Sequence, residues 1–352
     1  MQLSVKNKSI ELGIYTFGAI LPNPYTNHTI TAKQRIHEII SAAQLADEAG
    51  LDVFGLGEHH RLDFAVSATS VVLSAIAQTT NKIRLTSAST VLSTTDPVRL
   101  FEDIATLDLI SNGRAEIIAG RGAFTESYPL FGHDLKDSKD LFEEKLKLLI
   151  EINKNEKVTW NGKFRSSLHD AQISPRPQQT EIPIWVGVGS NLESATKAGK
   201  HGQGLALVIL GGYPSRVQPI IEAYRRAGKE AGFHSDDLKI SISCHGYITS
   251  DFLQAQNEFY GYYSNYYKYF MSKNGSDVLL IDDYKHLVRP ETALLVGDPE
   301  LIIEKILKQY EMFRNDRFMI HLDIRGIPYT KLARAIELLA TRVAPALRNE
   351  LS

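Results

Sequence analysis

The sequence predicts a (β/α)8 barrel, in which eight parallel strands close into a cylinder and a helix follows each strand. Two observations favour this fold class. Eight short apolar runs alternate with eight longer runs in which apolar residues recur at helical spacing. The chain has 352 residues, and barrels of more than about 200 residues commonly form one domain. An open doubly wound sheet has the same alternation, so the pattern alone leaves both folds open.

The predicted strands are short and rich in apolar residues; they cover residues 11–17, 52–57, 83–88, 114–120, 182–188, 205–210, 239–248 and 318–323. The predicted helices cover residues 31–49, 68–80, 97–110, 139–153, 191–199, 214–231, 299–313 and 329–347. Thr31 is a suitable N-cap for the first helix, and Gly50 stops it. Pro97 suits the first turn of the third helix.

Two longer segments interrupt the alternation, at residues 155–181 and 251–297. We interpret them as insertions on the C-terminal face of a single domain that spans residues 1–352. The second insertion contains six tyrosines within residues 259–270. This run favours an inserted helix that packs on the barrel, although an apolar pocket or a subunit contact would use the same residue types.

The composition excludes several classes of function. The net charge is −2, with 39 basic and 41 acidic residues, which is not the pattern of a protein that binds nucleic acid or an anionic membrane. No apolar run reaches the ~18 residues of a membrane span, and the first ten residues lack the apolar core of a secretory signal. Cys244 is the only cysteine, which excludes an intrachain disulfide and a cysteine-cluster metal site. We therefore expect a cytoplasmic protein.

The end of the second predicted strand carries Glu58, His59 and His60, followed by Arg61. In a barrel the active site lies at this end of the strands. Three interpretations fit: a catalytic or cofactor-contacting histidine, a metal site, or a surface cluster at a loop start. Adjacent strand residues point to opposite faces, so His59 and His60 should not share one ion.

Small residues and one arginine follow the third and fourth strands. Residues 86–90 are mostly serine and threonine, which leave room for a planar ligand and offer hydrogen-bond donors. Gly120, Arg121 and Gly122 combine glycines, which allow close backbone approach, with a natural partner for an anion. Taken alone, both segments are equally compatible with ordinary loops.

The fifth strand ends in Gly187, Gly189 and Ser190, directly before a predicted helix. Backbone N–H groups at a helix N-terminus bind phosphate well. Leu192 stands where the dinucleotide fingerprint needs its third glycine, so this is not that motif. A helix N-cap after a glycine turn is the alternative.

Together these segments resemble the bacterial luciferase-like monooxygenases. The family's motifs occur in its order and spacing at residues 46–52, 57–60, 81–85, 96–100, 107–114, 120–122, 131–132, 182–187, 326–328 and 343–347. The resemblance covers nearly the whole chain. It implies a TIM barrel that binds reduced FMN or, in one branch of the family, a deazaflavin.

The resemblance also implies roles for individual residues. His59 matches a histidine near the flavin ring that is catalytic in some members, and Ala88-Ser89 matches a non-prolyl cis peptide that lies against the ring. Arg121 matches an arginine that contacts the flavin phosphate. The implied cofactor-binding residues are Ala88, Ser89, Gly120, Arg121, Gly187, Gly189 and Ser190. Residues 273–289 match a mobile loop. The family usually has an aromatic residue where Arg61 stands, which argues against long-chain aldehyde chemistry.

The sequence thus predicts an FMN-dependent monooxygenase that uses reduced flavin and O2 on a small organic substrate. His59 is the expected acid–base residue, and no metal is expected. We expect a separate flavin reductase as a partner and a homodimeric assembly. A deazaflavin-dependent dehydrogenase on the same fold and a non-catalytic flavin-binding subunit are the alternatives.

Overall fold

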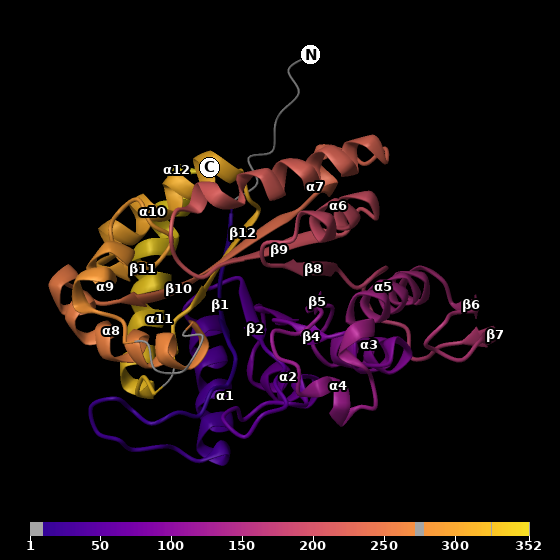
Figure 1. The fold of residues 1–352 in the computed structure, drawn as a ribbon, viewed down its shortest axis with the longest axis horizontal. Coiled ribbons are helices and arrows are strands. Elements are labelled where there is room, and N and C mark those ends of the chain that lie inside the picture. The colour runs from indigo at the N-terminus through magenta and orange to yellow at the C-terminus, as the bar shows by residue number, and fades with distance from the viewer. Residues whose placement is uncertain (1–9, 272–277, 325, 352) are drawn as a thin grey trace.

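The computed structural model describes residues 10–271, 278–324 and 326–351. Within them, parallel strands form one closed barrel (Figure 1). The barrel strands are β1 (Glu11–Thr16), β2 (Val53–Leu56), β3 (Arg84–Ser87), β5 (Ala115–Gly120), β8 (Ile184–Val188), β9 (Gly204–Ile209), β10 (Ile240–Ile248) and β12 (Arg317–His321). Strand β12 pairs with β1, and β10 pairs with both β9 and β12, which closes the sheet. The predicted barrel is confirmed, and the open sheet is wrong.

Helices surround the barrel, and each of the eight predicted helices begins within a few residues of its predicted start, although the last one is divided into two. They are α1 (Ala32–Glu48), α2 (Thr69–Thr79), α3 (Pro97–Ile110), α5 (Ser138–Lys154), α6 (Leu192–Lys200), α7 (Gln218–Glu230), α10 (Pro299–Phe313), α11 (Tyr329–Leu338) and α12 (Ala344–Glu350), with a π turn at Leu339–Val343 between the last two. Thr31 and Asp96 accept hydrogen bonds from the first-turn amides of α1 and α3. Among the described residues, no helix has the length and apolar character that crossing a membrane requires.

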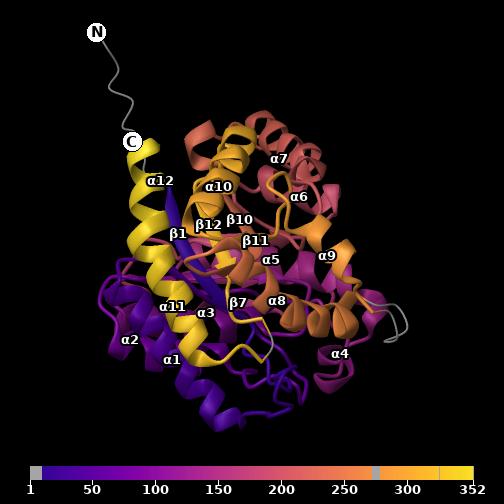
Figure 2. The ribbon, with the colours of Figure 1, turned by 90° about the vertical axis from the view of Figure 1, so that its left-hand side faces the viewer.

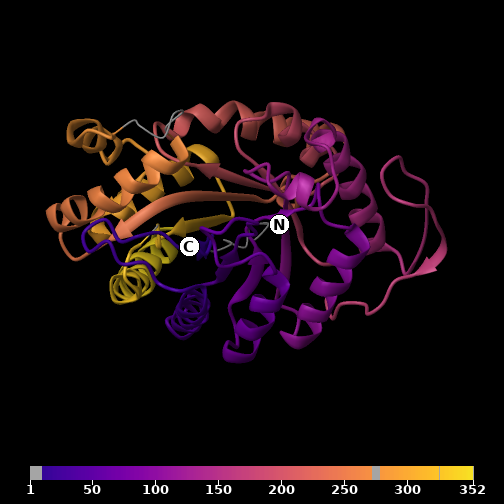
Figure 3. The same cartoon turned by 60° about the horizontal axis from the view of Figure 1, so that its bottom comes forward.

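Short elements extend the barrel. Strand β4 (Thr90–Val91) pairs with β5, α4 (Ser127–Leu130) follows β5, and single 3-10 turns lie at Leu135–Asp137, Pro214–Val217 and Ser235–Asp237. The insertion at 155–181 contains a hairpin of β6 (Lys157–Trp160) and β7 (Leu168–Gln172), which projects from the barrel (Figures 1 and 3).

The insertion at 251–297 forms α8 (Phe252–Tyr266), a π turn at Tyr267–Met271, α9 (Ile281–Leu287) and β11 (Leu295–Gly297), which pairs with β10 (Figure 2). The tyrosine-rich helix packs on the barrel as expected, since Phe259 stacks on Tyr247 of β10 at 5.3 Å between ring centroids. Residues 273–277 of the expected mobile loop lie outside the described residues. In its described part, the buried Tyr284 of α9 packs against Tyr260 of α8.

A buried ionic network fills the N-terminal end of the barrel. Alternate strand residues face the interior, and there Glu116 accepts hydrogen bonds from Arg317 at 2.6 and 3.1 Å, from Trp185 at 3.2 Å, and from Arg84. Arg317 also donates to Glu11 at 2.8 Å. Burial would raise the pKa of Glu116, but the two guanidinium groups outweigh it and lower the pKa from 4.5 to about 2.

Candidate active site

His59 lies in an aromatic setting at the C-terminal end of β2. Its ring centroid is 4.0 Å from that of Phe64, 5.2 Å from Phe17 and 5.3 Å from Phe124. The neighbouring His60 lies elsewhere, with Nε2 2.8 Å from Glu58 Oε1. The two imidazoles therefore have separate surroundings, although both lie beyond the end of β2 and strand alternation is not the cause. In the described part of the chain, no group of three or more His, Cys, Asp or Glu side chains could hold a metal ion.

Small residues line the mouth at the ends of β2, β3 and β5. The Ala88-Ser89 peptide bond is cis. Gly120 lies so close to Ser89 that a Cβ there would be 2.5 Å from the serine Oγ, and a Cβ on Gly57 would be 3.1 Å from the Ala88 carbonyl oxygen. Only glycine permits such close approach. The structure thus brings Ala88, Ser89 and Gly120 together into one compact surface, which we call the small-residue platform.

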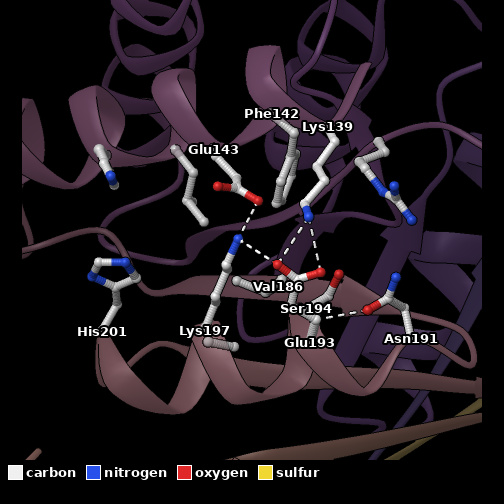
Figure 4. A pocket seen from close by; sticks show the side chains of 13 residues that line it. Lys139, Phe142, Glu143, Val186, Asn191, Glu193, Ser194, Lys197 and His201 are labelled. Atoms are coloured by element: carbon white, nitrogen blue, oxygen red, sulfur yellow. Dashed lines mark hydrogen bonds and ion pairs between the residues drawn. The ribbon is translucent and has the colours of Figure 1, made fainter. Parts of the chain in front are cut away.

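Arg121 and the N-terminus of α6 border one cavity. The cavity has a volume of about 210 Å³ and lies between α5 and α6, with Arg121, Lys139, Asn191, Glu193 and Ser194 among its lining residues (Figure 4). The Asn191 side chain caps α6 by accepting from the Ser194 amide at 3.0 Å. The expected pairing of an arginine with a helix N-terminus is therefore present.

Charges in this cavity are paired across the two helices. Figure 4 shows Lys139 of α5 and Lys197 of α6 converging on Glu193, with each N–O distance at 2.9 Å. The hydrogen bonds from Lys139 and Lys197 lower the pKa of Glu193 to about 2. The predicted phosphate-turn residues Gly189 and Ser190 directly precede Asn191 and are exposed. A Cβ on Gly189 would meet no atom within 4 Å.

The charge of Arg61, the residue that departs from the family pattern, is paired with two carboxylates. Its Nε is 2.9 Å from Asp63 and its Nη1 is 2.8 Å from Glu126. Its guanidinium lies over the Phe124 ring, 4.7 Å from the centroid. Hydrogen bonding with Asp63 is the largest cause that raises the pKa of Arg61. The side chain therefore holds Phe124 in place beside His59.

Sequence reasoning missed a second polar group on the opposite side of the mouth. Tyr15, His245 and His321 are inward-facing residues of β1, β10 and β12, and all are buried. His321 Nε2 is 2.9 Å from Asp323 Oδ1, and Arg35 of α1 bonds to the same carboxylate. The signal was available, since His321 and Asp323 stand at the end of a predicted strand, as His59 does.

Comparison with known proteins assigns the family. A model described as luciferase-like monooxygenase matches residues 11–315. The chain belongs to the luciferase-like monooxygenase family. The prediction of an oxidoreductase enzyme is confirmed, because the named relatives include flavin-dependent and other monooxygenases.

Individual relatives of this luciferase-like chain are distant in sequence but match its full length. The oxygenase component of the flavin-dependent trigonelline monooxygenase of Acinetobacter baylyi is 24% identical over 334 residues, 90% of this chain and 91% of that protein. The oxygenating constituent of 3,6-diketocamphane monooxygenase from Pseudomonas putida, solved with FMN, has a TM-score of 0.78 at 20% identity, covering 96% and 98% of the chains. An F420-dependent secondary alcohol dehydrogenase has a TM-score of 0.74 at 18% identity, covering 96% and 99%.

The residues at the mouth fit a flavin mononucleotide. The small-residue platform carries no bulky side chain, so a planar ring could lie against it. Arg121 and the amides that begin α6 are suited to a phosphate group. The open space at Gly189 lets a ligand approach the backbone before α6.

Proposed function

We propose that this chain is an FMN-dependent monooxygenase that uses reduced FMN and O2 to oxygenate a small organic substrate. One observation carries the proposal. The platform of Ala88, Ser89 and Gly120, the imidazole of His59, and Arg121 beside the α6 N-terminus all lie at the same end of the barrel. The residues proposed for the ring, for proton transfer and for the phosphate therefore share one end of the barrel, which supports flavin chemistry there.

The proposed roles follow from the chemistry of each group. Arg121 and the first amides of α6 hold the phosphate, and the platform supports the ring. When bound, reduced FMN would supply the electrons that activate O2. His59 then moves a proton at the reacting face, because imidazole exchanges protons near neutral pH. The rings of Phe17, Phe64 and Phe124 exclude water from that imidazole.

The surroundings of His59 also support a class of substrate. Three phenylalanine rings lie against it, and the charge of Arg61 is neutralised by Asp63 and Glu126. We therefore propose a small substrate with an apolar or planar portion. We propose that a separate reductase supplies the reduced flavin. The word "component" in the trigonelline relative's name supports this arrangement.

The second candidate is a deazaflavin-dependent dehydrogenase. The structural likeness to an F420-dependent secondary alcohol dehydrogenase favours it. The same mouth would then transfer hydride without O2. The two candidates differ in cofactor and in oxygen consumption, so one set of measurements separates them.

The experiment titrates the purified chain with FMN and with F420, following fluorescence quenching, and then supplies reduced FMN in an oxygen electrode with a panel of small substrates. We expect one FMN per chain, and oxygen consumption that leads to an oxygenated product. Tight F420 binding with oxygen-independent turnover would support the dehydrogenase. FMN binding without turnover of any substrate would favour a non-catalytic subunit. The homodimer stays a prediction, which light scattering of the same sample checks.

A further inference from the structure

A second imidazole–carboxylate pair lies across the mouth from the small-residue platform. His321 is the last residue of β12, and its Nε2 is 2.9 Å from Asp323 Oδ1. The side chains of His321 and Asp323 are each only 5% exposed. The proposed function uses neither residue. The ring centroid of Phe17 lies 5.2 Å from that of His59 and 4.8 Å from that of His321. The two histidines therefore flank one phenylalanine.

Arg35 fixes the carboxylate of this pair. It reaches from α1 to bond Asp323 Oδ2, and its Nη2 also donates to Thr16 Oγ1 at 3.2 Å. Burial would raise the pKa of Asp323, but the Arg35 guanidinium outweighs that effect and lowers it. Asp323 is therefore an ionised acceptor. Its Oδ1, which has no other hydrogen-bond partner in the described structure, lies 2.9 Å from Nε2 of His321. A ring proton on Nε2 faces this oxygen, and that tautomer leaves Nδ1 as a bare acceptor.

The Nδ1 atom of His321 is buried, and it has no hydrogen-bond partner among the described residues. A buried polar atom of this kind is unfavourable unless a ligand or water completes it. The titratable groups in contact with the His321 ring are Tyr15 of β1, His245 of β10 and Asp323. Behind them, Tyr266 of α8 packs on His245, Arg35 of α1 pairs with Asp323, and Glu38 pairs with Arg35.

His245 differs from His321 in one decisive respect. Its ring lies 5.3 Å from that of His321, and both of its nitrogens lack hydrogen-bond partners in the described structure. No carboxylate holds it. Burial and the neighbouring His321 lower the pKa of His245 well below its usual value. A charge that develops on His321 is balanced by Asp323, whereas one on His245 is not.

We propose that His321 is a second acid–base residue of the flavin site, whose bare Nδ1 accepts a ring proton of reduced flavin. The inference rests on the proposed function. Reduced flavin carries a ring N–H that the oxidised ring lacks, so an oriented acceptor favours the reduced state. The proton moves toward Nδ1 while Nε2 keeps its own, and Asp323 stabilises the positive charge that develops. Asp323 and Arg35 are positioning residues.

The first test is nitrogen NMR of the chain labelled with 15N-histidine. In the chain without flavin, we expect His321 to carry its proton on Nε2 and to show an unprotonated Nδ1. Anaerobic addition of reduced FMN should move the Nδ1 resonance toward its protonated position. The exposed His234 is the internal control and should not move. The opposite tautomer, or an unchanged Nδ1 once reduced FMN is bound, would overturn the proposal.

The second test compares His321→Phe with the matched control His245→Phe. Phenylalanine keeps an aromatic ring against Tyr15 and Phe17 and leaves the Asp323–Arg35 pair intact. We expect His321→Phe to weaken reduced FMN about tenfold, the value of one hydrogen bond, and to leave oxidised FMN unchanged. His245→Phe should change neither. Equal weakening of both redox states would show a packing role and defeat the proposal.

Failure of the proposed function gives a different result. If the unmodified chain binds neither form of FMN, the flavin assignment fails and this inference fails with it, whatever the tautomer. If the chain binds FMN but the His321 resonance and affinities do not respond, only the inference fails. Asp323→Asn adds a check on positioning, since it should abolish the response of Nδ1 to reduced FMN while His321 remains in place.

Discussion

The two ends of this barrel both bury polar side chains, but they partner them differently. At the N-terminal end, Glu116 accepts hydrogen bonds from Arg317, Arg84 and Trp185. At the C-terminal end, the hydroxyl of Tyr15, both nitrogens of His245, Nδ1 of His321 and Oδ1 of Asp323 have no hydrogen-bond partner within the described residues. At the N-terminal end, the neutral hydroxyl of Ser241 also has none, but the charged groups are paired. Both groups lie inside the same eight strands, so burial alone does not explain the difference.

The difference separates stability from function. Burying charges without partners costs several kcal/mol, so a network whose charges are all paired indicates a structural role. Buried polar atoms without partners persist where a ligand completes them. In barrels, the N-terminal end serves stability and the C-terminal end serves chemistry. Substitutions at the two ends should therefore affect different measurements.

The largest expected effect is at the C-terminal end. His59→Asn should slow turnover by about 10²–10⁴-fold, the usual contribution of a positioned acid or base. FMN affinity and melting temperature should stay close to those of the unmodified chain, because His59 contacts aromatic rings and no buried charge depends on it. Stopped-flow turnover and thermal unfolding check the two expectations. Unchanged turnover would move the acid–base role to another residue.

The matching change at the N-terminal end is Glu116→Gln. It leaves the buried Arg317 with Glu11 as its remaining carboxylate and takes the partner of the half-buried Arg84, so the free energy of unfolding should fall by about 3–5 kcal/mol. FMN affinity of the folded fraction should not change. Glu300→Gln is the control, since its pair with Arg342 is exposed and should contribute at most about 1 kcal/mol. Urea denaturation measures both. If Glu116→Gln were as stable as Glu300→Gln, Glu116 would have no structural role.

The pH dependence of stability tests the same carboxylate. The pKa of Glu116 is about 2 in the folded chain and 4.5 in the unfolded reference. Its contribution is therefore complete above pH 4.5 and is lost as pH falls toward 2. The unmodified chain should lose stability more steeply than Glu116→Gln across this window. If the stability of the two proteins fell in parallel with pH, Glu116 would not have a lowered pKa in the folded chain.

Much of this comparison could not be predicted from the sequence. The strand and helix limits could, because each depends on local periodicity and caps such as Thr31 and Asp96. The contacts of Arg35 with Asp323 could not, since they join residues 288 apart and depend on how β1 and β12 pair. Strands β4 and β11 were missed because a strand of two or three residues is too short to show the alternation of apolar and polar residues. The roles of His59 and Arg121 came from resemblance, and their ligand remains a proposal.

Arg121→Ala tests the proposed phosphate site and should have a smaller effect. We expect FMN affinity to fall by about 1.5–3 kcal/mol, the strength of a hydrogen bond to a charged group. Stability should be nearly unchanged, because the side chain is exposed. Arg99→Ala on the surface of α3 is the control and should leave FMN affinity unchanged. Riboflavin, which has no phosphate, should bind Arg121→Ala and the unmodified chain equally. If Arg121→Ala lost as much affinity for riboflavin as for FMN, Arg121 would contact the flavin ring and not the phosphate.

The smallest expected effect is at Gly189, and it should have opposite signs in two measurements. A Cβ there meets no atom within 4 Å, and the residue is not among the glycines with positive φ. Gly189→Ala should therefore stabilise the chain by about 0.4–1 kcal/mol, because alanine restricts the unfolded state. If the flavin phosphate lies against this backbone, the added methyl should weaken FMN binding while leaving riboflavin unaffected. Thermal unfolding and fluorescence titration measure the two changes. A variant that binds FMN as tightly as the unmodified chain would show that the phosphate does not approach Gly189, and would leave Arg121 and the α6 amides as the remaining phosphate ligands.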